Sequence, residues 1–88
     1  SLHMWIYVEN VAKLKANSMK IQLGSGGAGD VDRHQWSLAL QNGWNELTLN
    51  FADAEVKDAD FSKINYFRIW RPANESTTVI VDDVRVIK

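Results

Sequence analysis

Two alternating stretches near the end of the chain, residues 64–71 and 78–86, constrain the fold most strongly. A polar break at 72–77, which contains the chain's single proline, separates them. Both stretches alternate apolar and polar residues with the period of two that is typical of β-strands. We therefore expect two adjacent strands that form a β-hairpin-like pair. Because successive strand residues face opposite ways, one face of the first strand should carry an aromatic and cationic row: Tyr66, Arg68 and Trp70.

The same alternation recurs in four earlier stretches. These are residues 2–9, 19–23, 33–40 and 44–51. In the third stretch Trp36 shares a face with leucines, which predicts that this indole lies in the core. In the fourth, Trp44 lies on the same side of the strand as the polar residues and is expected to point outward. The chain thus predicts about six strands, an all-β pattern.

The connections differ in character. Asn42-Gly43 is a strong signal for a tight hairpin turn between the third and fourth strands. Residues 10–16 read as a crossover loop with a helical turn, and residues 52–63 as an ordered excursion or an edge. The glycine-rich segment 24–32 reads as a mobile turn, with calcium binding by its aspartates as the alternative.

Composition limits the class of protein. Eighty-eight residues predict a single domain, 1–88, and the absence of cysteine excludes disulfides and thiolate metal sites. A net charge of -1 with interspersed signs gives no footprint for nucleic acid or an anionic membrane, so we expect neither as a partner. No apolar run approaches the roughly 20 residues of a membrane span.

No group of residues suggests catalysis. The two histidines, His3 and His34, lie on separate predicted strands, and no serine or cysteine nucleophile accompanies them. Asp82 and Asp83 are adjacent, so they should face opposite ways and cannot flank one glycosidic bond. We expect a protein that is not an enzyme.

Asp82 is the most unusual carboxylate because it sits among valines. Alternation places it with Ile80, Val84 and Val86, which predicts burial, and a buried carboxylate needs a partner. Two interpretations remain open. The acid either lies at a bulge or strand end, satisfied by backbone N–H groups or an arginine, or it binds a structural calcium ion.

Aromatic residues also mark the strand predicted at residues 2–9. His3, Trp5 and Tyr7 share the side of that strand that faces away from its aliphatic residues. If this strand neighbours the Tyr66–Trp70 strand in one sheet, two aromatic rows would line a single surface, which suits the flat rings of pyranoses. The alternative is that a loop or further strands cover these indoles.

Taken together, the segments WIYV, IQLGS, NGWN followed by LTL, YFRIW and VIVDDVRV resemble the C-terminal part of jelly-roll carbohydrate-binding modules of the galactose-binding-like group. The resemblance implies an antiparallel jelly-roll β-sandwich, and a bacterial, extracellular or cell-surface accessory module of glycoside hydrolases. It implies glycan binding by Trp5, Tyr7, Tyr66, Arg68 and Trp70, and a structural Ca²⁺ with Asp82 as ligand. Such modules have about eight or more strands, so the sandwich is expected to be completed by another segment or chain.

The predicted function is therefore non-catalytic carbohydrate binding, with a polysaccharide or oligosaccharide held on an exposed aromatic sheet face. The alternative is a structural or assembly module, a spacer or strand-exchanged oligomer, in which that face is buried. Open sheet edges invite pairing with other strands, so we expect as a further partner either an N-terminal segment of the parent protein or a second copy of the chain.

Overall fold

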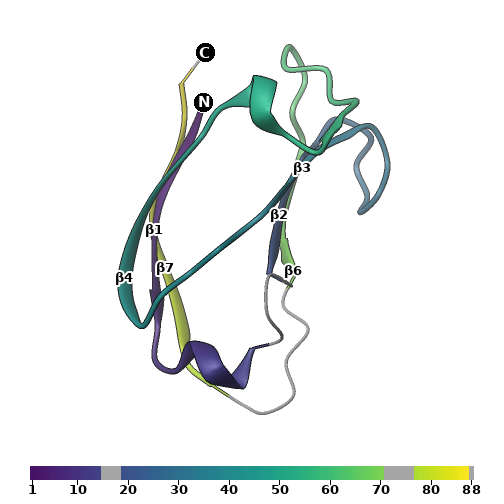
Figure 1. Cartoon of the computed structure of the whole chain (residues 1–88). Helices are drawn as coiled ribbons and strands as arrows, with labels where there is room; N and C mark the ends of the chain where they lie inside the picture. Colours follow the sequence, from purple (N-terminus) through teal and green to yellow (C-terminus); the bar gives the residue numbers. More distant parts are fainter. Residues whose placement is uncertain (15–18, 71–76, 88) are drawn as a thin grey trace.

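The computed structural model describes residues 1–14, 19–70 and 77–87, and it is an all-β sandwich (Figure 1). Two antiparallel sheets are present, with strand orders β4-β1-β7 and β5-β3-β2-β6. The described residues contain no α-helix. The elements are β1 Leu2–Val8, η1 Val11–Lys13, β2 Lys20–Gly24, β3 Arg33–Ser37, β4 Gly43–Leu49, η2 Phe51–Asp53, β5 Val56–Lys57, β6 Tyr66–Trp70 and β7 Val79–Val86. The predicted fold class is confirmed, with a short seventh strand, β5, in the excursion predicted at 52–63.

The core lies between the sheets and is built by alternation. In β1, Leu2, Met4, Ile6 and Val8 are at most 1% exposed, whereas Trp5 is 37% exposed. Ile21 and Leu23 of β2 face them from the other sheet, within one cluster of buried residues. Burial of each such side chain contributes about 1.5–3 kcal/mol. Trp36 is also in this cluster, as predicted, and its indole N–H donates to the Asn50 carbonyl at 2.9 Å.

A ring cluster closes one end of the core. The buried His34 ring lies edge-on to Phe61, with centroids 4.6 Å apart, and Phe61 stacks on Phe51. His34 Nδ1 accepts a hydrogen bond from the Ala59 N–H at 3.1 Å, and burial lowers the pKa of this imidazole. These contacts hold the polar 52–63 excursion against the sandwich.

The hairpin-like pair expected at 64–86 does not form. β6 pairs with β2, and β7 pairs with β1 in the other sheet. Most of the predicted break, residues 71–76, lies outside the described residues. The prediction was wrong because two alternating strands close in sequence can each add to the edge of a different sheet, as in Greek-key connections.

The prediction of an Asn-Gly hairpin is also wrong, and of its two central residues only Gly43 has a positive φ. Gly43 has the expected positive φ, +89°, but β3 ends at Ser37 and belongs to the other sheet from β4. Figure 1 shows the chain crossing from β3 to β4 between the layers. Asn45 fixes this corner, since its side-chain amide donates to the Gln41 carbonyl at 2.9 Å and accepts from the Gln41 N–H at 3.0 Å.

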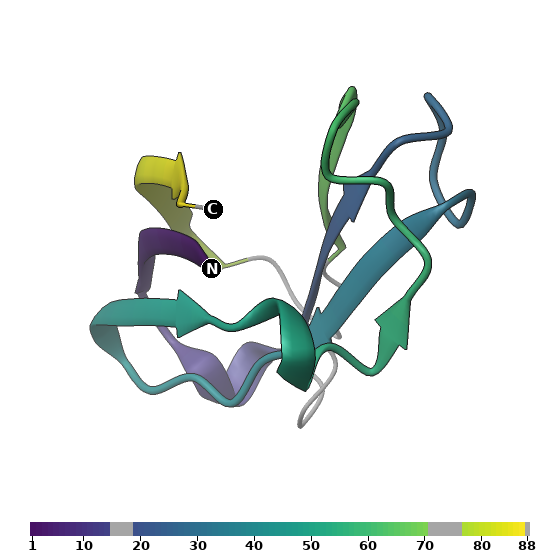
Figure 2. The same cartoon turned by 90° about the horizontal axis from the view of Figure 1, so that it is seen from above.

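One side of the sandwich is open. β7 and β6 are the last strands of their sheets on this side, where the sheets diverge (Figure 2). Val81 and Val86 pair with the inward-facing Ile6 and Leu2, yet they are 36% and 41% exposed. Phe67, which pairs with Leu23, is 40% exposed. Among the described residues, nothing covers these apolar side chains fully. No helix in the described ranges is long or apolar enough to cross a membrane.

Candidate ligand-binding site on the outer face of the β5-β3-β2-β6 sheet

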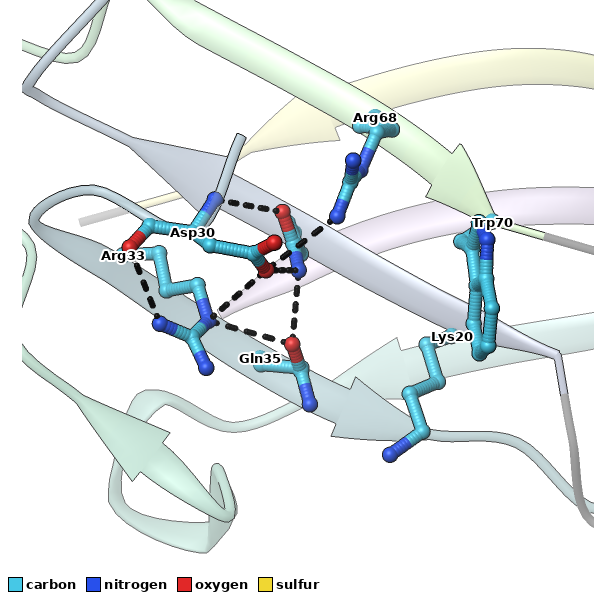
Figure 3. Close-up of a pocket in the computed structure, with 7 residues that line it drawn as sticks. Lys20, Asp30, Arg33, Gln35, Arg68 and Trp70 are labelled. Atoms are coloured by element: carbon cyan, nitrogen blue, oxygen red, sulfur yellow. Dashed lines mark hydrogen bonds and ion pairs between the residues drawn. The ribbon is translucent and has the colours of Figure 1, made fainter. Parts of the chain in front are cut away.

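The outer face of the β5-β3-β2-β6 sheet, here called the polar face, carries a hollow of about 330 Å³ (Figure 3). The register brings its side chains together across three strands, because Gln22 of β2 lies opposite Gln35 of β3 on one side and Arg68 of β6 on the other. Lys20 lies opposite Trp70 in the same way. The lining residues are Lys20, Gln22, Asp30, Arg33, Gln35, Arg68 and Trp70.

Two glutamines form the floor of this hollow. Gln22 is 2% exposed and Gln35 is 8% exposed, unusually low values for residues on an outer sheet face. The Gln22 amide donates to Gln35 Oε1 at 2.6 Å and to Asp30 Oδ1 at 2.9 Å. Because each amide has partners on both sides, the network fixes the side chains that surround it.

Asp30 is the junction between the loop and the sheet. Besides the bond from Gln22, its carboxylate accepts from Arg68 Nη2 at 3.2 Å and lies 3.7 Å from Arg33 Nε. The hydrogen bond from Gln22, followed by the charges of Arg68 and Arg33, lowers the pKa of Asp30. Asp30 therefore stays ionised at neutral pH and holds both guanidinium groups at the hollow.

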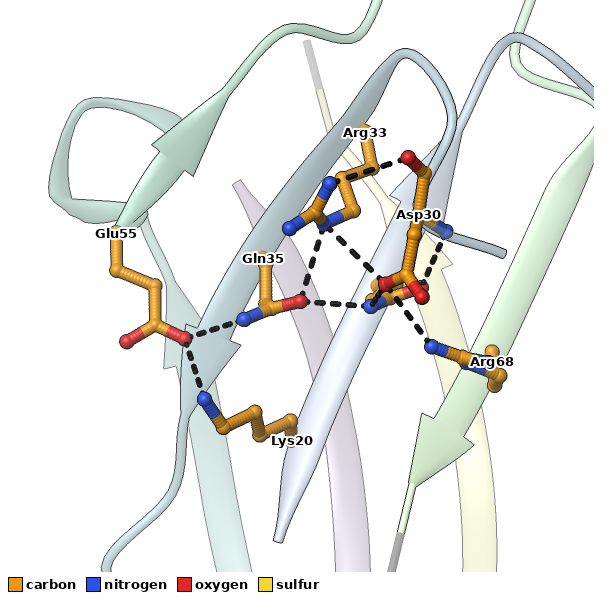
Figure 4. A network of polar contacts seen from close by, with 7 residues as sticks. Lys20, Asp30, Arg33, Gln35, Glu55 and Arg68 are labelled. Carbon is orange, nitrogen blue, oxygen red and sulfur yellow. Dashed lines mark hydrogen bonds and ion pairs between the residues drawn. The ribbon is translucent and has the colours of Figure 1, made fainter. Parts of the chain in front are cut away.

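Glu55 closes the network at the opposite rim (Figure 4). It accepts from Gln35 Nε2 at 2.6 Å, from the Ser37 hydroxyl at 2.9 Å and from Lys20 Nζ at 3.3 Å. These contacts, with that from Gln35 the largest, lower the pKa of Glu55. A continuous polar chain thus runs from Arg68 through Asp30, both glutamines and Glu55 to Lys20.

The glycine-rich loop positions Asp30, a role that the sequence analysis missed. A Cβ added to Gly29 would lie 2.7 Å from Arg68 Nη1, so glycine permits the close approach of the loop to this side chain. Backbone bonds pin the loop, from Ser25 N–H to the Asp32 carbonyl and from Gly27 N–H to Asn65 Oδ1, both 2.9 Å. The Asp30 carboxylate accepts hydrogen bonds from Gln22 and Arg68, and calcium binding by the aspartates of this loop stays a prediction. The missed signal was an aspartate in a loop that returns to a strand bearing arginine.

The predicted aromatic and cationic row is present on β6, and two of its three members, Arg68 and Trp70, line the hollow. Tyr66, Arg68 and Trp70 lie on the same face of β6, as expected. The indole of Trp70 is 46% exposed, and among the described residues it has no aromatic partner. Arg68 is two thirds buried, and its buried Nε has no hydrogen-bond partner in the described part of the chain. Figure 3 shows the Trp70 ring standing beside the polar cluster.

Trp5 and Tyr7 lie elsewhere. β1 belongs to the β4-β1-β7 sheet, so these residues point out from the opposite side of the sandwich and not toward Trp70. There they contact Trp44, with ring centroids 6.4 Å from Trp5 and 5.5 Å from Tyr7. We call this surface, defined by Trp5, Tyr7 and Trp44, the aromatic face. The predicted single surface formed by both rows is therefore wrong.

Asp82 is exposed, which corrects the predicted burial. It pairs with the outward-facing Trp5, and the register of β7 shifts between this pair and the His3–Arg85 pair. Asp83, at φ +52°, lies in this bulge and donates its backbone N–H to Asp82 Oδ1 at 2.8 Å. The bulge moves Asp82 and Val86 to opposite faces, so simple alternation fails here. No group of three or more His, Cys, Asp or Glu able to hold a metal occurs in the described ranges. Calcium at Asp82 stays a prediction from the resemblance.

Comparison of the chain with protein-family models, with curated proteins and with solved structures found no match.

Proposed function

We propose that this domain is a non-catalytic carbohydrate-binding module whose glycan site is the polar face, with Trp70 as the stacking platform. The observation that carries the proposal is the position of an exposed indole at the edge of a hollow lined by hydrogen-bonding side chains. Sugar rings present an apolar C–H face and a rim of hydroxyls, and this arrangement offers a partner for each.

The network supports binding because it holds the polar groups in place before a ligand arrives. Gln22 and Gln35 are tied into neighbouring strands, and Asp30 fixes Arg68 and Arg33 at the hollow. A ligand hydroxyl would meet donors that lose little conformational entropy on binding. The open hollow suits a chain that passes along the sheet, with one ring over Trp70.

The two carboxylates of the network favour a binding role over glycoside hydrolysis. Hydrolysis requires a general acid whose pKa is raised, whereas the pKa values of Asp30 and Glu55 are both lowered by their hydrogen bonds. Each carboxylate is already engaged by amides and cations. These groups therefore act in the proposal as anchors for the binding side chains.

Affinity electrophoresis against a panel of soluble polysaccharides (xylan, mixed-linkage glucan, galactomannan and polygalacturonate) tests the proposal. We expect at least one to retard the parent chain, and Trp70→Ala to lose that retardation. Trp44→Ala is the matched control, because it removes an equally exposed indole from the aromatic face. Retardation lost in Trp44→Ala but kept in Trp70→Ala would place the site on the wrong face, and no retardation by any polysaccharide would refute the proposal.

The second candidate is a structural or assembly module. The open side of the sandwich favours it, because Val81, Val86 and Phe67 expose apolar surface that a further strand would cover. The two functions use different surfaces, so one chain can carry both. As a module of a larger secreted or cell-surface protein, the domain would hold glycan on one sheet and a neighbouring strand at the other.

A further inference from the structure

The outer edge of β7 is an unpaired strand edge, independent of the glycan site. β7 pairs with β1 on one side, and no described strand pairs with it on the other. Its exposed side chains include Ile80 at 47%, Val84 at 44% and Val86 at 41%. An edge of eight residues with this much apolar surface is a template for β-pairing.

The sequence of β7 is self-complementary when the strand is turned end for end. A two-fold axis between Asp83 and Val84 would set Asp82 of one copy opposite Arg85 of the other, and Val81 opposite Val86. Antiparallel partners must share a face. They do so here, because Asp82 and Arg85 pair with the outward-facing Trp5 and His3, whereas Val81 and Val86 pair with the inward-facing Ile6 and Leu2.

The bulge makes this match possible. Without the extra residue, Asp82 and Val86 would share a face, and the same pairing would oppose inward to outward side chains. In this register the irregular Asp83 and Val84 of both copies meet at the axis. Arg85, whose Nε lies 3.2 Å from Asp83 Oδ1 of its own chain, then also faces Asp82 of the second copy. A shift by one residue opposes unlike faces, for example Asp82 to Val86, and a shift by two separates Asp82 from Arg85.

From this self-complementarity we propose that the chain forms a homodimer through antiparallel β7–β7 pairing, with reciprocal Asp82–Arg85 ion pairs on the outer surface and Val81–Val86 contacts on the inner surface. The β4-β1-β7 sheets of the two copies then form one continuous sheet of order β4-β1-β7-β7-β1-β4. The pairing covers the edge of β7 and leaves the polar face on the opposite layer open to ligand.

Charge reversal tests the register. In sedimentation-velocity runs over a concentration series, the parent chain is expected to be a dimer. Arg85→Asp and Asp82→Arg each oppose like charges twice per dimer, so each should raise the dimer dissociation constant roughly tenfold or more. The double variant Asp82→Arg with Arg85→Asp restores opposite charges and should return the dissociation constant close to the parent value.

Lys57→Asp is the matched control, since it reverses a charge on β5, the edge strand at the far side of the other sheet. It should leave the dimer intact. Near-ultraviolet circular dichroism of the tryptophans confirms that each variant is folded. A parent chain that stays monomeric at the highest concentration overturns the proposal. A dimer that survives both single reversals, or one that the double variant fails to restore, overturns it as well.

Discussion

The polar face and the aromatic face are the outer surfaces of the same sandwich, yet they are built in different ways. The polar face has a single exposed indole, Trp70, set against a hollow whose amides and charges are joined by hydrogen bonds. On the aromatic face, the ring of Trp44 packs against the rings of Trp5 and Tyr7. On the proposed function, exposure of a tryptophan does not by itself mark a binding site, and a free ring beside fixed polar groups is the better criterion.

The largest expected difference between the faces is in how much the free energy of unfolding falls when a polar side chain is removed. Gln22→Leu removes a buried amide that bridges Asp30 and Gln35, so it should lower the free energy of unfolding by about 1–3 kcal/mol. Thr48→Leu, an exposed polar position on the outer side of β4, should change it by less than about 0.5 kcal/mol. Urea unfolding followed by tryptophan fluorescence measures both. Equal costs would mean that the network of the polar face contributes no special stability.

The two exposed tryptophans Trp44 and Trp70 should differ in what they contribute. Trp44 should contribute mainly to stability, and Trp70 mainly to glycan binding. Trp44→Ala loses its ring contacts and should lower the free energy of unfolding by about 0.5–1.5 kcal/mol while leaving glycan affinity unchanged. Trp70→Ala should cost less stability and should weaken binding at least about tenfold, equivalent to about 1.4 kcal/mol. Isothermal titration calorimetry on the retarding polysaccharide, alongside urea unfolding, separates the two effects. A large stability loss in Trp70→Ala would show that its ring is structural.

The glycine-rich loop offers a sharper test within the polar face. Gly29→Ala places a methyl group against the Arg68 guanidinium, which must move, so glycan affinity should fall a few-fold with little change in stability. Gly27→Ala is the matched control. Its added Cβ meets nothing, but its φ of +75° disfavours alanine, so it should cost about 1 kcal/mol of stability and leave affinity unchanged. The same calorimetry and unfolding series measures both variants, and equal affinities would disconnect the loop from the site.

The smallest expected effect is in the pH dependence of stability. Asp30 and Glu55 have lower pKa values in the folded chain than in the unfolded chain, so the unfolded state takes up protons first as the pH falls. Their contribution to the free energy of unfolding should be complete above about pH 4.5, the ordinary pKa of Glu. It should be lost as the pH falls through the lowered pKa values. Glu55→Gln and Gln35→Leu should each flatten the acid limb of a plot of unfolding midpoint against pH. Curves that run parallel to that of the parent chain would contradict this account.

The strands were predictable because alternation is a local property. Leu2–Val8 and Lys20–Gly24 appear where the sequence indicates them, and Trp36 is buried for the same reason. Pairing was not predictable, because which sheet a strand joins depends on contacts between distant residues. This is why β6 and β7 separate, and why Trp5 and Trp70 lie on opposite layers.

Only part of the candidate site could be predicted from the sequence. The row Tyr66, Arg68 and Trp70 follows from the period of β6, whereas Gln22 and Gln35 resemble ordinary outward-facing strand residues until the register places them side by side. Asp30 lies in a loop whose return path no local pattern encodes. Asp82 was misplaced because a single residue with positive φ, Asp83, inverts the alternation of β7.

The most direct test of the glycan-binding proposal is an NMR titration that follows the indole N–H signals of the four tryptophans. Trp36 reports on the core, Trp5 and Trp44 on the aromatic face, and Trp70 on the polar face. On addition of oligosaccharides from the retarding polysaccharide, the Trp70 signal should shift in a saturable manner while the other three stay in place. Saturable shifts of Trp5 or Trp44 with a stationary Trp70 would contradict the account.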